Sequence, residues 1–252
     1  MNNQNPLFQY CLRLADNSMI LSHRLSQTCA SAPFLEEDVA LTNIALDLLG
    51  QASAFYKYAV EIEDKGRTED DLAYHRNERD YLNFQLVEYP NTDFAYIIVR
   101  QFLADAFYYH LYQQLSKSKD EKLASIAAKS LKEVTYHLRH SGQWMIRLGK
   151  GTEESKQRVQ VAVNDLWTYT QELFEADNID EILLGDGIAA DLNLVKKSWE
   201  EVVSELFKKA NIKPPECRYF VTGSKQGIHT ESFGHMLSDM QYLQRAYPDA
   251  KW

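Results

Sequence analysis

Apolar residues recur in alternating steps of four and three over long stretches of this chain. This spacing places side chains on one face of an α-helix that packs against a nearly parallel neighbour. Four long stretches show the pattern, and turn signals or charged loops separate them. The pattern therefore predicts long helices over 7–30, 33–63, 93–118 and 121–149.

Shorter apolar repeats follow the four long ones, and the residues around 177–191 read as an acidic loop that contains glycine. Only 10 Gly and 6 Pro occur in 252 residues, which argues against a turn-rich β-sandwich or barrel. With no low-complexity linker, the chain is predicted to be one all-α domain over 1–252, with a four-helix core over 7–149. The further helices are predicted near 72–88, where Tyr89-Pro90 ends the helical piece, and at 153–176, 192–210 and 230–246.

Charge and cysteine content exclude several classes of partner. The net charge of −9 argues against nucleic acid, whose binding depends on clustered Lys and Arg. No apolar stretch approaches the length of a membrane-spanning helix, and the first residues lack a signal peptide's basic start and apolar run. The three cysteines include no C-x-x-C pair, so a reducing compartment fits. We therefore expect a cytoplasmic protein with neither a nucleic-acid nor a membrane partner.

Four acidic residues are placed as two corresponding pairs on the four long helices. Asp16 and Asp47 lie on the first and second of them, and Asp105 and Glu133 on the third and fourth. Di-iron four-helix bundles place a carboxylate on one helix and Glu-x-x-His on the next, twice over. The spacing thus suggests a duplicated helix pair with the arrangement of a di-iron site.

The histidines of that arrangement are missing, because Gly50 follows Asp47 by three positions and Tyr136 follows Glu133 by three. His137 lies one position further, at i+4 from Glu133, from where both side chains could reach one metal. We expect no catalytic, cofactor-binding or metal-binding residues in this chain. Were a metal to bind, its ligands would come from Asp16, Asp47, Asp105, Glu133 and His137.

Carboxylates that have lost a metal need other partners, since an unpaired buried charge is costly. We expect the four acidic side chains to point inward and to be satisfied by protein hydrogen bonds or by protonation. The nearest cations along the helices are His137 for Glu133, and His23 and Arg24 for Asp16.

Six segments together resemble the structural (C-type) subunits of ring 1,2-phenylacetyl-CoA epoxidases, bacterial multicomponent monooxygenases of phenylacetate degradation. The resemblance covers nearly the whole chain. It implies a ferritin-like fold, a homologous catalytic subunit that holds the di-iron centre, further subunits and a separate reductase. Such a chain would support catalysis in the complex without performing it. In isolation it would form a homodimer. The segments are LRLADN (12–17), DVALTNIALDLLGQ (38–51), VEYPNTDF (87–94), KEVTYHLR (132–139), GIHTE (227–231) and MQYLQR (240–245).

Two other interpretations stay open. The chain could be an independent ferritin-like di-iron oxidase or oxygenase with an atypical ligand set. Iron storage, a third class, would require a ferroxidase ligand set for which the sequence offers no evidence.

His229-Thr-Glu231 reads as the capped start of a helix. The 15 tyrosines, several of them within 107–112, suggest that part of the aromatic surface meets another subunit.

Overall fold

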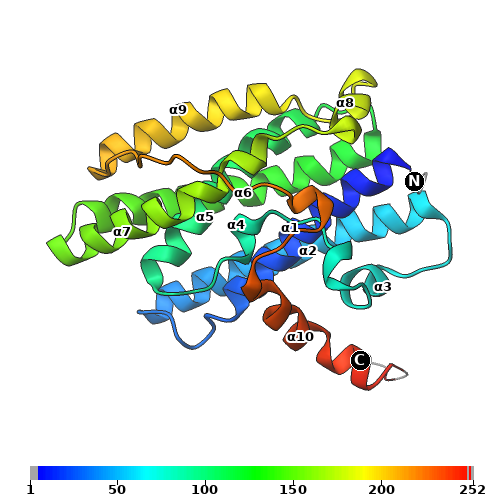
Figure 1. Cartoon of the computed structure of the whole chain (residues 1–252), viewed down its shortest axis with the longest axis horizontal. Helices are drawn as coiled ribbons and strands as arrows, with labels where there is room; N and C mark the ends of the chain where they lie inside the picture. Colours follow the sequence, from blue (N-terminus) through cyan, green and yellow to red (C-terminus); the bar gives the residue numbers. More distant parts are fainter. Residues whose placement is uncertain (1–4, 249, 251–252) are drawn as a thin grey trace. The chain divides into compact units, whose positions relative to one another are not determined.

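The computed structural model describes residues 5–248 and 250. These residues form ten α-helices and four short 3₁₀-helices, with no β-strand among them (Figure 1). The predicted all-α fold class is therefore confirmed. The helices group into two compact units: unit 1 contains the described residues up to Pro90 and from Gly223 onward, and unit 2 contains Asn91–Thr222. The single domain over 1–252 stays a prediction.

Unit 1 is built on an antiparallel pair of helices, α1 (Pro6–Ser26) and α2 (Leu35–Glu63). Pro6 starts α1 because its missing N–H needs no partner there, and Asn5 caps the helix through the Leu7 N–H. Between the helices, Ser22 donates to the Ala45 carbonyl at 2.7 Å. Most residues of α1 are buried.

The predicted end of the first helix at residue 30 is wrong, because α1 ends at Ser26. Residues 27–31 form turns and residues 32–34 form a bend instead. The Thr28 hydroxyl donates to the Leu25 carbonyl at 2.6 Å, and Ala30 has a φ of 66°. A helix cannot continue through a left-handed residue, so the chain reverses here toward α2.

The predicted helical piece over 72–88 is also wrong as one element. The structure has α3 (Glu69–Tyr74), a 3₁₀ turn η1 (Glu78–Asp80) and one turn of helix, α4 (Gln85–Glu88). The backbone between η1 and α4 is satisfied by side chains of α1 rather than by helical hydrogen bonds, since the Phe84 N–H donates to Asn17 at 2.9 Å. The last helix of unit 1 is α10 (Glu231–Ala246), close to its predicted bounds.

Unit 2 is built around α5 (Phe94–Leu115), which packs along α6 (Glu121–Gly149) and also contacts α7 (Glu153–Leu166) and α9 (Leu192–Ala210). Most of α5 is buried, in keeping with its position among three helices. An Asp or Thr caps each helix start in this unit by accepting a hydrogen bond from the first turn. These caps are Asp93, Asp120, Thr152, Asp177 and Asp191.

The predicted acidic loop near 177–191 contains a further helix, α8 (Asn178–Gly185). Asp177 and Asp180 form a capping box there, so acidic residues that resemble a loop in the sequence are the start signal of a helix. The predicted helix over 153–176 is also too long. It ends at Leu166 and continues as two 3₁₀ turns, η2 (Trp167–Tyr169) and η3 (Gln171–Phe174). Within the described range, none of the helices combines the length and apolar character that a bilayer crossing requires.

Candidate functional site: buried carboxyl groups

Asp16 is fully buried on α1, and protein donors occupy both of its carboxylate oxygens. Oδ1 accepts hydrogen bonds from the Tyr56 hydroxyl at 2.6 Å and from Arg76 Nη2. Oδ2 accepts from Arg76 Nη1 at 3.1 Å and from the Leu82 N–H at 2.9 Å. Four donors match the roughly four lone-pair positions of a carboxylate, so the group is saturated.

Arg76 reaches Asp16 from the loop that follows α3, and its remaining N–H groups are also used. Nε donates to the Leu72 carbonyl at 2.5 Å, and Nη1 donates to the Asp80 carbonyl at 2.7 Å. The guanidinium lies 4.0 Å from the centre of the Tyr81 ring. Burial by itself lowers the pKa of Arg76, but the neighbouring Asp16 carboxylate raises it above its ordinary value. The two groups therefore form a buried ion pair with complete hydrogen bonding.

The expected partners of Asp16 along its own helix were wrong. Arg24 donates through Nε to the Glu88 carbonyl at 2.7 Å, and burial lowers the pKa of His23, which favours its neutral form. The true partner, Arg76, is 60 positions away in the sequence. Helix periodicity relates only residues on one helix, so no local pattern pointed to it.

Asp105 is the corresponding buried carboxyl in unit 2. Its Oδ1 accepts from Gln101 Nε2 at 2.7 Å, and its Oδ2 lies 2.8 Å from the Ser141 hydroxyl. Burial raises the pKa of Asp105 to about 8, against the lowering effect of the Ser141 and Gln101 hydrogen bonds. At neutral pH this carboxyl is therefore mostly a neutral acid.

The hydrogen bonds of Ser141 fit a protonated Asp105. The single Ser141 hydroxyl hydrogen faces three acceptors, Asp105 Oδ2 at 2.8 Å, the His137 carbonyl at 3.0 Å and the Leu138 carbonyl at 3.4 Å. Ser141 can donate to an ionised Asp105, and a protonated Asp105 can donate to Ser141 while Ser141 donates to the His137 carbonyl, so this geometry accommodates the neutral acid. Burial favours the neutral form, and the hydrogen-bond geometry is compatible with it.

The other predicted positions are less enclosed. Asp47 and Glu133 are half-buried, and Lys129 lies 3.9 Å from Glu133. The inward orientation is therefore confirmed for Asp16 and Asp105, while Asp47 and Glu133 stand at the edge of the core. Gly50 and Tyr136 are exposed, and His137 is fully buried.

These residues do not fit a di-iron centre. Such a centre needs carboxylates with open lone pairs together with histidine nitrogens. Asp16 has its oxygens occupied by four donors, and the two oxygens of Asp105 face Gln101 and Ser141. Across the described part of the chain, no three His, Cys, Asp or Glu side chains are placed to share a metal ion.

Unit 1 contains a second buried pair, Glu88 with His229, which was not predicted from the sequence. The Glu88 carboxylate accepts from His229 Nδ1 at 2.5 Å, from Asn83 Nδ2 at 2.8 Å and from the Thr230 N–H at 2.7 Å. His229 Nε2 lies 3.0 Å from the Tyr81 carbonyl. Both ring nitrogens of His229 are thus engaged, one by the Glu88 carboxylate and the other by the Tyr81 carbonyl.

The capping role expected for 229–231 is therefore only partly right. Thr230 is the N-cap residue of α10, but its side chain makes no capping hydrogen bond and pairs with the Ser232 hydroxyl at 2.9 Å. His229 holds the segment before α10 against α4 instead. The two residues of this pair are 141 positions apart in the sequence, and no spacing rule relates a histidine and a glutamate at that separation.

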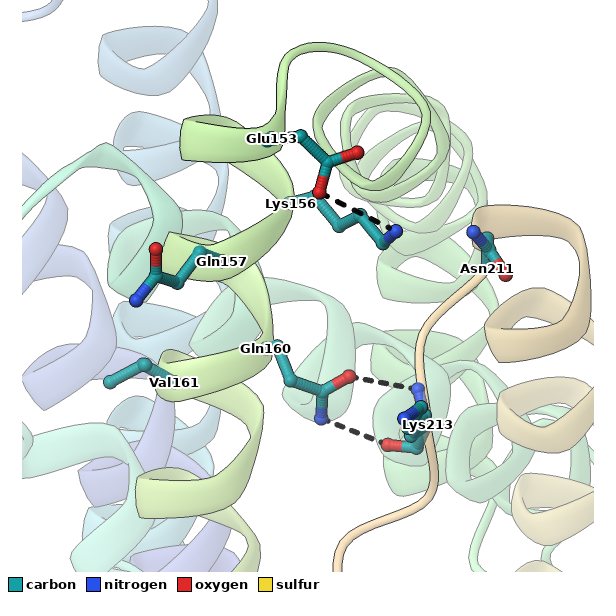
Figure 2. A pocket seen from close by; sticks show the side chains of 7 residues that line it. All are labelled: Glu153, Lys156, Gln157, Gln160, Val161, Asn211 and Lys213. Atoms are coloured by element: carbon teal, nitrogen blue, oxygen red, sulfur yellow. Dashed lines mark hydrogen bonds and ion pairs between the residues drawn. The ribbon is translucent and has the colours of Figure 1, made fainter.

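A surface pocket of about 440 Å³ lies between α7 and the end of α9 in unit 2 (Figure 2). Gln160 bonds both backbone groups of Lys213, at 2.8 and 3.0 Å, and Lys156 faces Glu153 at 3.8 Å. Two lysines, Lys156 and Lys213, and one glutamate, Glu153, line the pocket. It contains no nucleophile with a neighbouring base, so it offers no catalytic arrangement.

Antiparallel helix pairs whose buried carboxyl groups bond to Arg, Tyr, Ser and Gln define an all-helical protein of the ferritin-like class. The family model described as "Phenylacetic acid catabolic protein" matches residues 1–252, and the chain belongs to this family. It is 48% identical over 248 residues to the C-type subunit of the 1,2-phenylacetyl-CoA epoxidase of Escherichia coli (strain K12), covering 98% of this chain and 100% of that relative. The resemblance inferred from the six segments is confirmed.

Proposed function

We propose that this chain is the structural subunit of a 1,2-phenylacetyl-CoA epoxidase, a monooxygenase complex of phenylacetate degradation. Full-length similarity to a relative named as a subunit of that enzyme supports this assignment. In this proposal the chain scaffolds a homologous catalytic oxygenase subunit in the cytoplasm. The di-iron centre belongs to that partner, and a reductase and further subunits complete the complex.

The saturated Asp16 carboxylate carries the non-catalytic part of the proposal. A guanidinium, a phenol and a backbone amide hold this carboxylate, and Arg76 uses all its donors within the same cluster. Such a pair keeps an acidic position in the core without leaving an unpaired charge. The chain can therefore retain the shape of a di-iron bundle without a metal.

The experiment co-expresses the tagged chain with the catalytic subunit and measures epoxidation of phenylacetyl-CoA and iron per subunit. We expect activity and about two irons per catalytic subunit, as in di-iron bundles, and neither with this chain alone. Arg76→Gln should lower the yield of the complex, while Arg79→Gln, an exposed arginine three residues away, serves as the matched control.

Two results would contradict the proposal. Stoichiometric iron in the isolated chain after anaerobic reconstitution, with turnover by itself, would favour an independent di-iron oxygenase. Full activity and solubility of the catalytic subunit without this chain would remove the scaffolding role.

A further inference from the structure

Helix α6 carries a band of mostly basic side chains on its solvent side. Six exposed residues recur there in steps of three and four, and at about 100° per residue they fall within about 80° of the helix circumference. The buried side of α6, which includes Val134 and Met145, lies opposite. From 129 to 147 the band is about 27 Å long at about 1.5 Å per residue. This basic band consists of Lys129, Lys132, Tyr136, Arg139, Gln143 and Arg147, and Lys150 continues it at the C-cap position.

The basic band contains no acidic residue, although acidic residues outnumber basic ones by 36 to 27 in the whole chain. On α7, by contrast, the exposed Arg158 pairs with Glu154 one turn away at 2.8 Å. In the band only Lys129 has such a neighbour, Glu133 at 3.9 Å, and the Lys129 side chain is 75% exposed, so that pair is weak. The band is therefore a local excess of positive charge on an acidic protein.

The remaining cations of the band have no acidic partner within the part of the chain that the structure describes. These cations are Lys132, Arg139, Arg147 and Lys150. Cations in the last turn of a helix interact favourably with its dipole, but Lys132 and Arg139 lie too far from the end of α6 for that. Lys129 and Lys132 are three positions apart and repel each other. Helix stability thus does not account for the band.

Aromatic rings hold two of the arginines in place. The Arg139 guanidinium lies 5.5 Å from the centre of the Tyr136 ring, and the Arg147 guanidinium lies 5.1 Å from that of Trp144. Trp144 in turn meets Phe94 edge to face at 5.0 Å. An arginine against a ring keeps its N–H donors free for carboxylates and has less freedom to lose on binding. Arg, Tyr and Trp are also the residue types most enriched at binding hot spots.

The shape and charge of the band select the kind of partner. The band is the outer side of a helix and not a cleft, so it could enclose little of a small ligand. Obligate interfaces are largely apolar, whereas a charged surface favours encounters that electrostatics steers and that dissociate quickly. The net charge of −9 disfavours nucleic acid. A carboxylate-rich protein surface complements the band best.

We propose that the basic band of α6 is the docking surface for an acidic face of a protein that binds transiently. This inference rests on the proposed function, which makes the chain a subunit of a monooxygenase served by a separate reductase. Proteins that deliver electrons form small encounter complexes with their acceptors. The reductase is therefore the partner that we assign to the band, and the chain would contribute to electron delivery by positioning it.

The test measures the dissociation constant of labelled reductase for the purified complex of this chain with the catalytic subunit, at about 20 and about 200 mM salt. Gln143→Glu adds one negative charge in the middle of the band and should raise the constant about three- to tenfold at low salt. Lys132→Glu combined with Arg139→Glu should raise it at least about 30-fold. Gln157→Glu, the same change at an exposed glutamine of α7, is the matched control and should leave it unchanged.

A second assay separates this inference from the proposed function. The isolated chain is mixed with a labelled peptide of about 20 glutamates or with a DNA duplex of about 20 base pairs at low salt. Peptide binding that is weakened by salt and by the double variant is expected, and circular dichroism checks that the variants keep their helicity. A complex that binds reductase through the band without epoxidation would contradict the proposed function alone.

Three results would overturn the docking surface. The first is reductase affinity that neither salt nor the double variant changes. The second is no binding of the glutamate peptide to the isolated chain. The third is binding of the duplex more tightly than the peptide, which would make the band a nucleic-acid surface instead.

Discussion

Replacing Asp105 by Asn tests whether the buried carboxyl of unit 2 is neutral. Asn keeps the size of the side chain and can accept from Gln101 through Oδ1 and donate to Ser141 through its amide. It therefore reproduces the protonated acid at every pH. The comparison isolates one titration, because all other groups are shared by the two proteins.

The magnitude follows from the pKa of Asp105, which is about 8 in the folded chain against an ordinary value of 3.8. Between these values the folded chain holds a proton that the unfolded chain has lost. The stabilisation from this group is thus complete below the lower pKa and disappears as pH rises through the higher one. The slope is about 1.4 kcal/mol per pH unit, or about 3 kcal/mol between roughly pH 5 and pH 7.

The assay is urea unfolding followed by tryptophan fluorescence at several pH values. Three of the four tryptophans, Trp144, Trp167 and Trp199, lie in unit 2, so most of the signal reports the unit that contains Asp105. We expect the wild-type free energy of unfolding, relative to Asp105→Asn, to fall by about 3 kcal/mol from pH 5 to 7. Asp186→Asn, at an exposed position of the same unit, is the matched control. A difference that is constant with pH, or that grows in favour of wild type as pH rises, would show that Asp105 is ionised and refute the reasoning.

Three further substitutions test the packing of the two units by urea unfolding. Arg76→Gln should cost about 3–5 kcal/mol because it leaves the Asp16 charge uncompensated, and adding Asp16→Asn should recover part of the loss; a double variant no better than the single one would contradict a buried ion pair. His229→Gln should lower the free energy of unfolding by about 1–3 kcal/mol, because it weakens the hydrogen bonding of the buried Glu88 carboxylate. His75→Gln, at an exposed histidine, should change it little. Equal effects of the two substitutions would contradict a buried role for His229. Gly149→Ala should destabilise unit 2, since a Cβ there would stand 2.1 Å from the Ala210 carbonyl oxygen. Gly50→Ala, where no atom lies within 4 Å of the added Cβ, should be neutral or stabilising. A tolerated Gly149→Ala would show that the close approach of α6 and α9 is not required.

The sequence by itself determined the helical class and most of the long helices. Periodicity is a local property, since residues three and four apart share a face whatever surrounds the helix. The fourth long helix, Glu121–Gly149, and the helix Leu192–Ala210 accordingly have their predicted bounds. The buried positions of Asp16 and Asp105 followed from the same pattern.

Only the tertiary structure decided what satisfies those carboxyl groups. The partner of Asp16 comes from a loop 60 positions away, and the pair Glu88 with His229 spans 141 positions. These contacts depend on how non-helical backbone crosses the long helices, and the segment between η1 and α4 is held by side chains rather than by its own hydrogen bonds. The start of α8 was likewise not predicted, because only the structure shows that its acidic side chains cap backbone N–H groups. Pairing across such distances depends on the position of the backbone in space, and one-dimensional spacing carries no information about it.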